Sequence, residues 1–212
     1  MTKPTVYGPV YSTYVRTTRM VLMEKGVDYD LVHVDMMTGQ HHQPEHCARQ
    51  PFEKVPAFEH NGFKLFETNA IAHYIDDAFP GRRIAPADLH RRSRDQQIVD
   101  ICCSYAYPRI IGGIVLQYFF ADKEKGPDKA AIAAAVGPAE HVLGVIQDLI
   151  SGPNQFLVSS DAGFSDLFLA PIVGYLSGIP EGPGILAKVP RLSQWWLAFQ
   201  HRPSFVATAP QM

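Results

Sequence analysis

The sequence predicts a two-domain protein: a small α/β domain at residues 1–80, a linker at 81–89 and an all-helical domain at 90–212. Three observations predict this. Strand-like and helix-like runs alternate in the first part, turn residues including Gly81 and Pro86 interrupt the pattern, and only helical periodicity follows. The 212 residues, 46% of them apolar, are enough for a core in each domain.

The first domain begins with a strand, a helix and a second strand. A short apolar strand is expected at 4–8, and a helix from Ser12 to Lys25 is ended by Gly26. Residues 28–34 alternate polar with apolar side chains, which is typical of a half-buried strand. The order so far is βαβ.

A hairpin and a helix complete this domain. The polar segment HHQPEHCARQ is expected to be a short helix or a loop, and Asn61-Gly62 then joins two strand-like runs as a strong hairpin signal. Helical spacing resumes over ETNAIAHYIDDAF. The domain therefore combines parallel with antiparallel strands, covered by helices.

The second domain is predicted to hold four helices. They are expected at 89–120 with an interruption near Pro108, at 127–150 with Pro138 inside, at 164–178 and at 190–200.

Composition excludes several classes of protein. The net charge of −2 and the absence of a Lys/Arg block argue against a nucleic-acid partner. No apolar run approaches the roughly 18 residues of a membrane span, and the start MTKPTVYG lacks a signal peptide, which predicts a cytoplasmic protein. Cys47, Cys102 and Cys103 contain no CxxC pair and are expected to be reduced thiols.

A metal site is not expected. His42 and His46 would share a helix face, but Pro44 lies between them and the HExxH arrangement is missing.

Four segments together resemble the cytosolic glutathione transferases, most closely the phi class or its bacterial relatives. They are VYGPVYSTYVRTTRMVLMEKG, HHQPE, QPFEKVPAFE and FETNAIAHYI. The resemblance implies a thioredoxin-like domain that binds glutathione, followed by an all-helical domain that carries the site for an apolar electrophile. It also implies a homodimer.

Ser12 is the candidate activator of the glutathione thiol. It lies where the first strand leads into the first helix, and a helix N-terminus favours an anion. Similar phi-class proteins use the serine at this position to hold the thiolate. The alternative is that Ser12 only caps the helix, although Val15 removes the capping-box pattern. Tyr7 is the main rival, because other classes use a tyrosine there, and Thr13 is a lesser one.

The resemblance assigns the peptide part of glutathione to two turns. It implies a cis bond at Val55-Pro56, where the backbone of Val55 would pair with the peptide. At Glu67-Thr68, the start of the third helix, the threonine would bind the γ-glutamyl carboxylate and the glutamate would meet the amino group. An ordinary helix start is the alternative.

His41 and Lys54 are the candidates for the glycyl carboxylate. Similar proteins often carry lysine where this chain has His42, so this contact is expected to depend on pH.

The remaining candidates have other roles. Tyr11 and Tyr118 are expected at the electrophile site, although core packing is the usual role of such aromatics. Phe52 resembles the aromatic side chain that inserts into the partner subunit of dimeric relatives. Gly163 and Asp166 resemble the capping element before a buried helix, which supports folding.

The expected reaction is attack of the glutathione thiolate on an apolar electrophile, or on a hydroperoxide. Two alternatives stay open: a non-catalytic binding or regulatory protein, and a specialised glutathione-dependent lyase, isomerase or dehalogenase. The sequence does not identify the electrophile.

Overall fold

The structure is a computed structural model that describes residues 2–152 and 155–210. Its contacts divide the described chain into two compact units. Residues up to Ala85 and those from Arg202 onward form the first unit, and Pro86–His201 form the second. The expected boundaries at 80 and 90 lie close to this division, but the expected helical domain ran on to the C-terminus.

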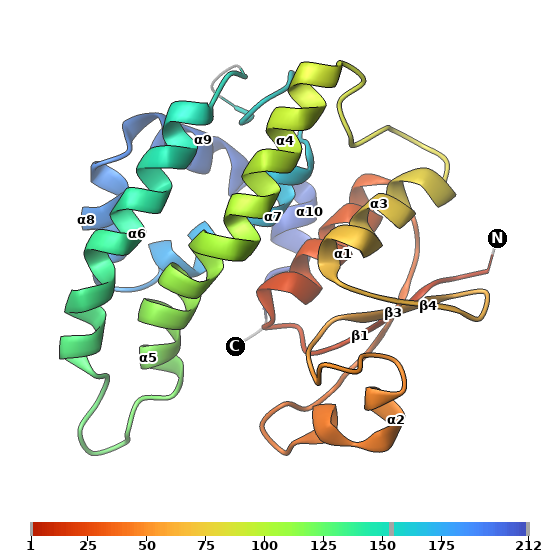
Figure 1. Ribbon diagram of the computed structural model, residues 1–212, viewed down its shortest axis with the longest axis horizontal. Helices are drawn as coiled ribbons and strands as arrows, with labels where there is room; N and C mark the ends of the chain where they lie inside the picture. The colour runs from red at the N-terminus through yellow and green to blue at the C-terminus, as the bar shows by residue number, and fades with distance from the viewer. Residues whose placement is uncertain (1, 153–154, 211–212) are drawn as a thin grey trace. The chain divides into compact units, whose positions relative to one another are not determined.

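The first unit is built on one sheet of four short strands. Its elements are β1 (Thr5–Tyr7), α1 (Thr13–Glu24), β2 (Asp30–Val32), the 3₁₀-helix η1 (Gln40–His42), α2 (Pro44–Cys47), β3 (Ala57–His60), β4 (Phe63–Phe66), α3 (Thr68–Ala78) and α10 (Pro203–Ala207). The strand order is β2-β1-β3-β4, with β1 and β2 parallel and the other pairs antiparallel. Figure 1 shows α1 and α3 on one face of the sheet and α2 on the other.

Local chemistry explains the boundaries of these elements. Ser12 caps α1 by accepting a hydrogen bond from the Val15 amide at 3.4 Å. Gly26, at φ 67°, ends the helix in the left-handed conformation that glycine adopts without cost. Asn61 and Gly62 both have positive φ, as a two-residue turn matched to the twist of a hairpin requires.

A buried ion pair ties the ends of α1 and α3 together. Lys25 Nζ lies 3.1 Å from the Asp76 carboxylate, and both side chains are about 1% exposed. The amides of Ile84 and Ala85 also donate to Asp76, at 2.9 and 3.1 Å. These donors lower the pKa of Asp76 although burial opposes them. The segment expected to be a plain linker is therefore fastened to the first unit up to Ala85.

The C-terminal residues pack on α1. Arg16 is 5% exposed, and its guanidinium donates to the Phe205 carbonyl at 2.8 Å and lies 3.7 Å from the centre of the Phe205 ring. Glu24 accepts hydrogen bonds from Arg202 at 2.6 and 2.7 Å and from Ser204 at 2.6 Å. Helix α10 was not predicted, because its five residues are too few for a periodic signal.

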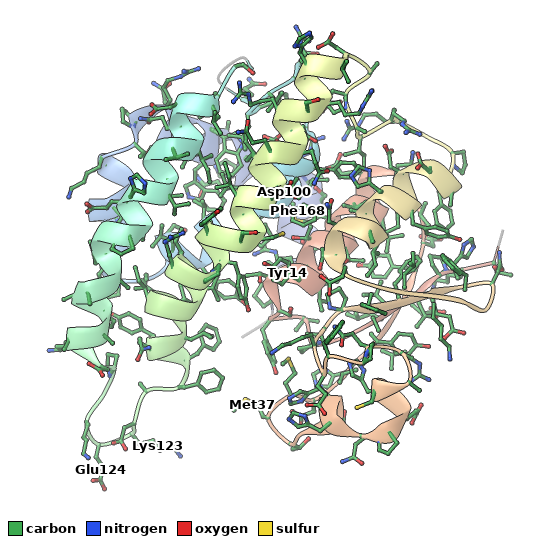
Figure 2. The ribbon with its side chains drawn as sticks, viewed as in Figure 1. Tyr14, Met37, Asp100, Lys123, Glu124 and Phe168 are labelled. Atoms are coloured by element: carbon green, nitrogen blue, oxygen red, sulfur yellow. The ribbon has the colours of Figure 1, made fainter. Side chains whose placement is uncertain are left out.

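The second unit is all-helical. Its elements are α4 (Leu89–Ile101), the π-helix η2 (Cys102–Val115), α5 (Leu116–Phe119), α6 (Lys129–Leu149), α7 (Phe164–Ser177), α8 (Gly182–Ala187) and α9 (Pro190–Phe199). Figure 2 shows Lys123 and Glu124 at the tip of the loop that joins α5 to α6, and places Phe168, which is 2% exposed, on α7.

The predicted interruption near Pro108 is wrong. Helical structure runs without a break from Leu89 to Phe119, and Pro108 lies inside η2. A proline removes one amide donor and crowds the preceding turn of an α-helix. The wider π-helical turn accommodates both effects, so the chain changes its helix type here instead of breaking. Helix α8 was not predicted either, because two of its six residues are glycine and one is proline.

Leu89–Phe119 and Lys129–Leu149 are long and apolar enough to cross a bilayer by length and composition. Each also packs its buried face in the helical unit, with Ile98, Ile114, Leu143 and Ile146 fully buried. A core helix of a folded domain passes the same test of composition, so this is weak support for a membrane span.

Two buried carboxylates hold the start of α7. Asp166 accepts from the Gly163 amide at 2.9 Å and from the Trp195 indole at 2.7 Å, and burial raises the pKa of Asp166 to about 7 despite these donors. Asp95 of α4 accepts from the amides of Phe164 and Ser165 at 3.2 and 3.0 Å. Asp95 therefore satisfies the first amides of α7, a role that the glycine at the cap position lacks the side chain to perform.

We expect Asp95→Ala to lower the free energy of unfolding by about 2–4 kcal/mol, because two buried amides and the Ser165 hydroxyl lose the acceptor of their hydrogen bonds. The matched control is Asp88→Ala, which removes an exposed cap from α4 and should cost about 1 kcal/mol. Urea unfolding measures both values. Equal losses would contradict the role assigned to Asp95.

Candidate active site

Strand register brings the candidate residues to one edge of the sheet. Tyr7, the last residue of β1, lies opposite Val32, the last of β2, and opposite Ala57, the first of β3. Ala57 also lies opposite Phe66, the last of β4. The segments that leave this edge carry Ser12, Val55-Pro56 and Glu67-Thr68. Ligands of α/β folds bind at such carboxyl ends of parallel strands.

Two helices of the first unit begin at this edge. The first turns of α1 and α3 present amide groups and the positive ends of their dipoles. Ser12 is half-buried at the cap of α1, and its oxygen accepts from Val15 at the long distance of 3.4 Å. A hydroxyl that accepts this bond keeps its proton for donation to another acceptor.

The hydroxyl and the ring of Tyr7 both contact charged side chains of the first unit. Its hydroxyl donates to a Glu59 carboxylate oxygen at 3.4 Å, and the Arg49 guanidinium lies 4.5 Å from its ring centre. Tyr7 also lines a cavity of about 260 Å³ together with residues of β2 and of α2, among them His46. Burial first, with Glu59 contributing, raises the pKa of Tyr7. A tyrosine in this environment keeps its proton and uses its hydroxyl as a hydrogen-bond donor to the Glu59 carboxylate.

Thr13 is buried at 5% exposure. Among the described residues its hydroxyl has no hydrogen-bond partner. It lies in the first turn of α1, next to Ser12.

The Val55-Pro56 peptide bond is cis, as the resemblance implies. Gly8 lets this turn approach α1, because a Cβ at Gly8 would collide with the Val15 side chain and lie 3.1 Å from the Val55 Cβ. The first turn of α1 and the turn at Val55 are thus neighbours, separated by a residue that has no side chain.

Glu67 and Thr68 begin α3. Glu67 has φ 67° and ψ 111°, a conformation that costs a non-glycine residue about 1–3 kcal/mol and that clusters at functional sites. Glu67 is exposed, whereas Thr68 is 7% exposed in the first turn of the helix. The pair places one carboxylate in solvent beside a hydroxyl and an amide.

The histidines of η1 lie next to the loop that precedes Val55. His42 Nδ1 is 2.8 Å from a Glu53 carboxylate oxygen, and the rings of His41 and His42 are 3.8 Å apart. Burial first, and then the charges of His42 and His46, lower the pKa of His41. No group of three or more His, Cys, Asp or Glu side chains in the described part of the chain could hold a metal ion.

Three buried polar atoms lie in segments that meet at this edge and have no hydrogen-bond partner within the described residues. They are Thr13 Oγ1, His41 Nδ1 and Asn69 Oδ1. Buried polar groups are normally paired, so these atoms fit a site that receives a polar ligand. Asn69, which follows Thr68 directly, was not among the candidates from the sequence. Only its place in the first turn of α3 could have marked Asn69 as a candidate for ligand binding.

The candidates for the second substrate differ in their surroundings. Burial first, followed by the Asp35 carboxylate, raises the pKa of Tyr11. Tyr118, in the second unit, donates its hydroxyl to both Glu181 carboxylate oxygens at 2.9 Å. Burial first, and then this contact with Glu181, raise the pKa of Tyr118. Their assignment to an electrophile site stays a prediction.

Comparison with known proteins identifies the family. A family model described as the N-terminal domain of glutathione S-transferase matches residues 3–77. Glutathione S-transferase F12 of Arabidopsis thaliana is 30% identical over 209 residues, covering 94% of both chains. Glutathione S-transferase F10 of the same plant is 31% identical over 196 residues, covering 91% of this chain and 89% of the relative.

A solved structure gives the same result. Poplar glutathione transferase F1 superposes with a TM-score of 0.86 at 27% identity, covering 98% of this chain and 97% of that one. The chain belongs to the glutathione S-transferase family. The predicted resemblance, the thioredoxin-like domain with a helical second domain, and the transferase function are confirmed.

The pKa of His41 predicts a pH-dependent affinity. With its pKa lowered, His41 is neutral near pH 7.5, and a bound carboxylate would favour its protonated form. We therefore expect the Kd of S-methylglutathione, which has no thiol to titrate, to fall roughly 3- to 10-fold between about pH 7.5 and 5.5. Calorimetry measures the Kd.

His41→Gln should remove this dependence, whereas His141→Gln, an exposed histidine of α6, should keep it. A wild-type affinity that does not change with pH would refute the role of His41.

Proposed function

We propose that Ser12 donates a hydrogen bond to the glutathione thiolate, which attacks an apolar electrophile. The proposal is supported by the position of Ser12 at the cap of α1. Its hydroxyl oxygen accepts a hydrogen bond from the Val15 amide, so its proton is available for donation to the thiolate. A hydrogen bond to a charged group contributes about 1.5–3 kcal/mol, and the helix end adds roughly 0.3–1. Together they suffice to lower the pKa of a thiol by ~2 units.

The rest of glutathione would lie along the same sheet edge. The backbone of Val55 would pair with the cysteinyl peptide, and Thr68 would bind the γ-glutamyl carboxylate at the start of α3. Glu67 would meet the amino group, and His41 or Lys54 the glycyl carboxylate. The unpartnered atoms of His41 and Asn69 support a polar ligand here.

In the conjugation step the thiolate forms a carbon–sulfur bond, and the leaving group departs with the electron pair of the bond that breaks. No general base is required, because the thiol has lost its proton before the attack. Tyr11 and Tyr118 are proposed for the electrophile site. Alternatively, the same thiolate would attack a hydroperoxide and reduce it.

A homodimer in the cytoplasm is part of the proposal. Phe52 is 65% exposed and touches Phe66 edge to face at 5.9 Å between ring centres. A large exposed aromatic is a typical anchor of a protein interface.

We expect Ser12→Ala to lower kcat/KM with a reactive aryl halide roughly 10- to 100-fold, the value of one lost hydrogen bond to a charge. The Kd of glutathione should change little, since the peptide contacts remain. Tyr7→Phe is the control and should retain most activity, and Thr13→Val tests the lesser rival.

Loss of activity in Tyr7→Phe alone would transfer the role to Tyr7. A wild-type protein that binds no glutathione would instead support the non-catalytic alternative. Turnover of one particular compound alone would support a specialised lyase, isomerase or dehalogenase.

A further inference from the structure

The backbone of Lys54 is held by two buried side chains. His46 Nε2 lies 2.7 Å from the Lys54 carbonyl oxygen, and Gln50 Oε1 accepts from the Lys54 amide at 3.2 Å. His46 is 4% exposed and Gln50 is 2% exposed. Gln50 Oε1 also accepts from the Phe52 amide at 2.7 Å. Both backbone groups of the residue that precedes Val55 are therefore fixed.

These contacts determine the direction of the Val55 backbone N–H. The Lys54 carbonyl and the Val55 amide belong to one planar, trans peptide unit, in which C=O and N–H point in opposite directions. His46 holds the oxygen, so the N–H of Val55 is turned away from α2. A rotation of this peptide plane would need the His46 contact to break first.

The hydrogen bond to the Lys54 carbonyl explains why a polar imidazole is buried at position 46. A carbonyl only accepts, so Nε2 must carry the proton. Nδ1, the other ring nitrogen, is buried and has no partner among the described residues. Burying such an atom costs free energy. A phenylalanine would fill the same space without this cost, so the imidazole is explained by its bond to Lys54.

We propose that His46 and Gln50 are positioning residues for glutathione, which orient the Val55 amide toward the cysteinyl carbonyl of the substrate. This inference rests on the proposed function, in which Val55 pairs with glutathione. Neither residue touches the substrate. His46 acts through the peptide unit between Lys54 and Val55, and Gln50 acts through the preceding unit, to which the Lys54 amide belongs. The thiol is held separately, by Ser12.

The test is the Kd and KM for glutathione in His46→Phe, which keeps an aromatic ring but removes the donor. We expect both constants to rise roughly 5- to 20-fold, as for one misaligned hydrogen bond. We expect kcat and the pKa of the bound thiol to stay unchanged. His46→Gln places an amide donor at this site and should recover part of the affinity.

Two further variants keep the test decisive. Gln50→Met removes the acceptor of the Lys54 amide and should raise KM in the same way, even if His46→Phe folds poorly. His60→Phe is the matched control: His60 is 6% exposed and contacts the Tyr74 hydroxyl at 2.9 Å, so this variant should lose stability but keep the wild-type KM.

Folded His46→Phe and Gln50→Met proteins with wild-type affinity would overturn the inference while the proposed function stands. A fall in kcat together with a raised thiol pKa would also contradict it, because the effect would then reach Ser12. If the wild type itself binds no glutathione, the proposed function fails instead.

Discussion

The site depends on the pairing of Ala57 with two strands at once. Because Ala57 lies opposite both Tyr7 and Phe66, the ends of β1 and β4 and the start of β3 meet at one point of the sheet. The turn to α1, the cis turn at Val55-Pro56 and the start of α3 follow from that register. A slip of one residue in β3 would turn its side chains to the opposite face and separate these segments.

Buried polar contacts hold the two helices that begin at this edge of the sheet in one arrangement. Lys25 and Asp76 join the far ends of α1 and α3, the two helices whose first turns face the candidate site. Arg16 and Glu24 fasten the C-terminal segment along α1. A buried pair of this kind adds little net stability, but losing one partner is costly, so it fixes one arrangement of the helices.

Much of the first unit could be predicted because local signals and fold agreed. Asn61-Gly62 specified a turn and Gly26 a helix end, and both lie where the sequence placed them. The helix type at Pro108 could not be predicted, since it depends on how the chain adapts to a missing amide. The positions of Ser12 and Thr68 at helix starts could be predicted, whereas their roles stay predictions. The contact of His46 with the Lys54 carbonyl joins a helix to a loop and has no periodic signal in the sequence.

In the proposed function, the N-terminus of α1 and Ser12 stabilise the thiolate of glutathione. The most direct test is the ultraviolet absorbance of the thiolate in the wild-type complex, titrated from about pH 5 to 9. We predict that the pKa of the bound thiol lies ~2 units below that of free glutathione. A bound thiol that titrates like the free one would rule out this role of Ser12 and the helix end, because binding would then leave the sulfur unactivated.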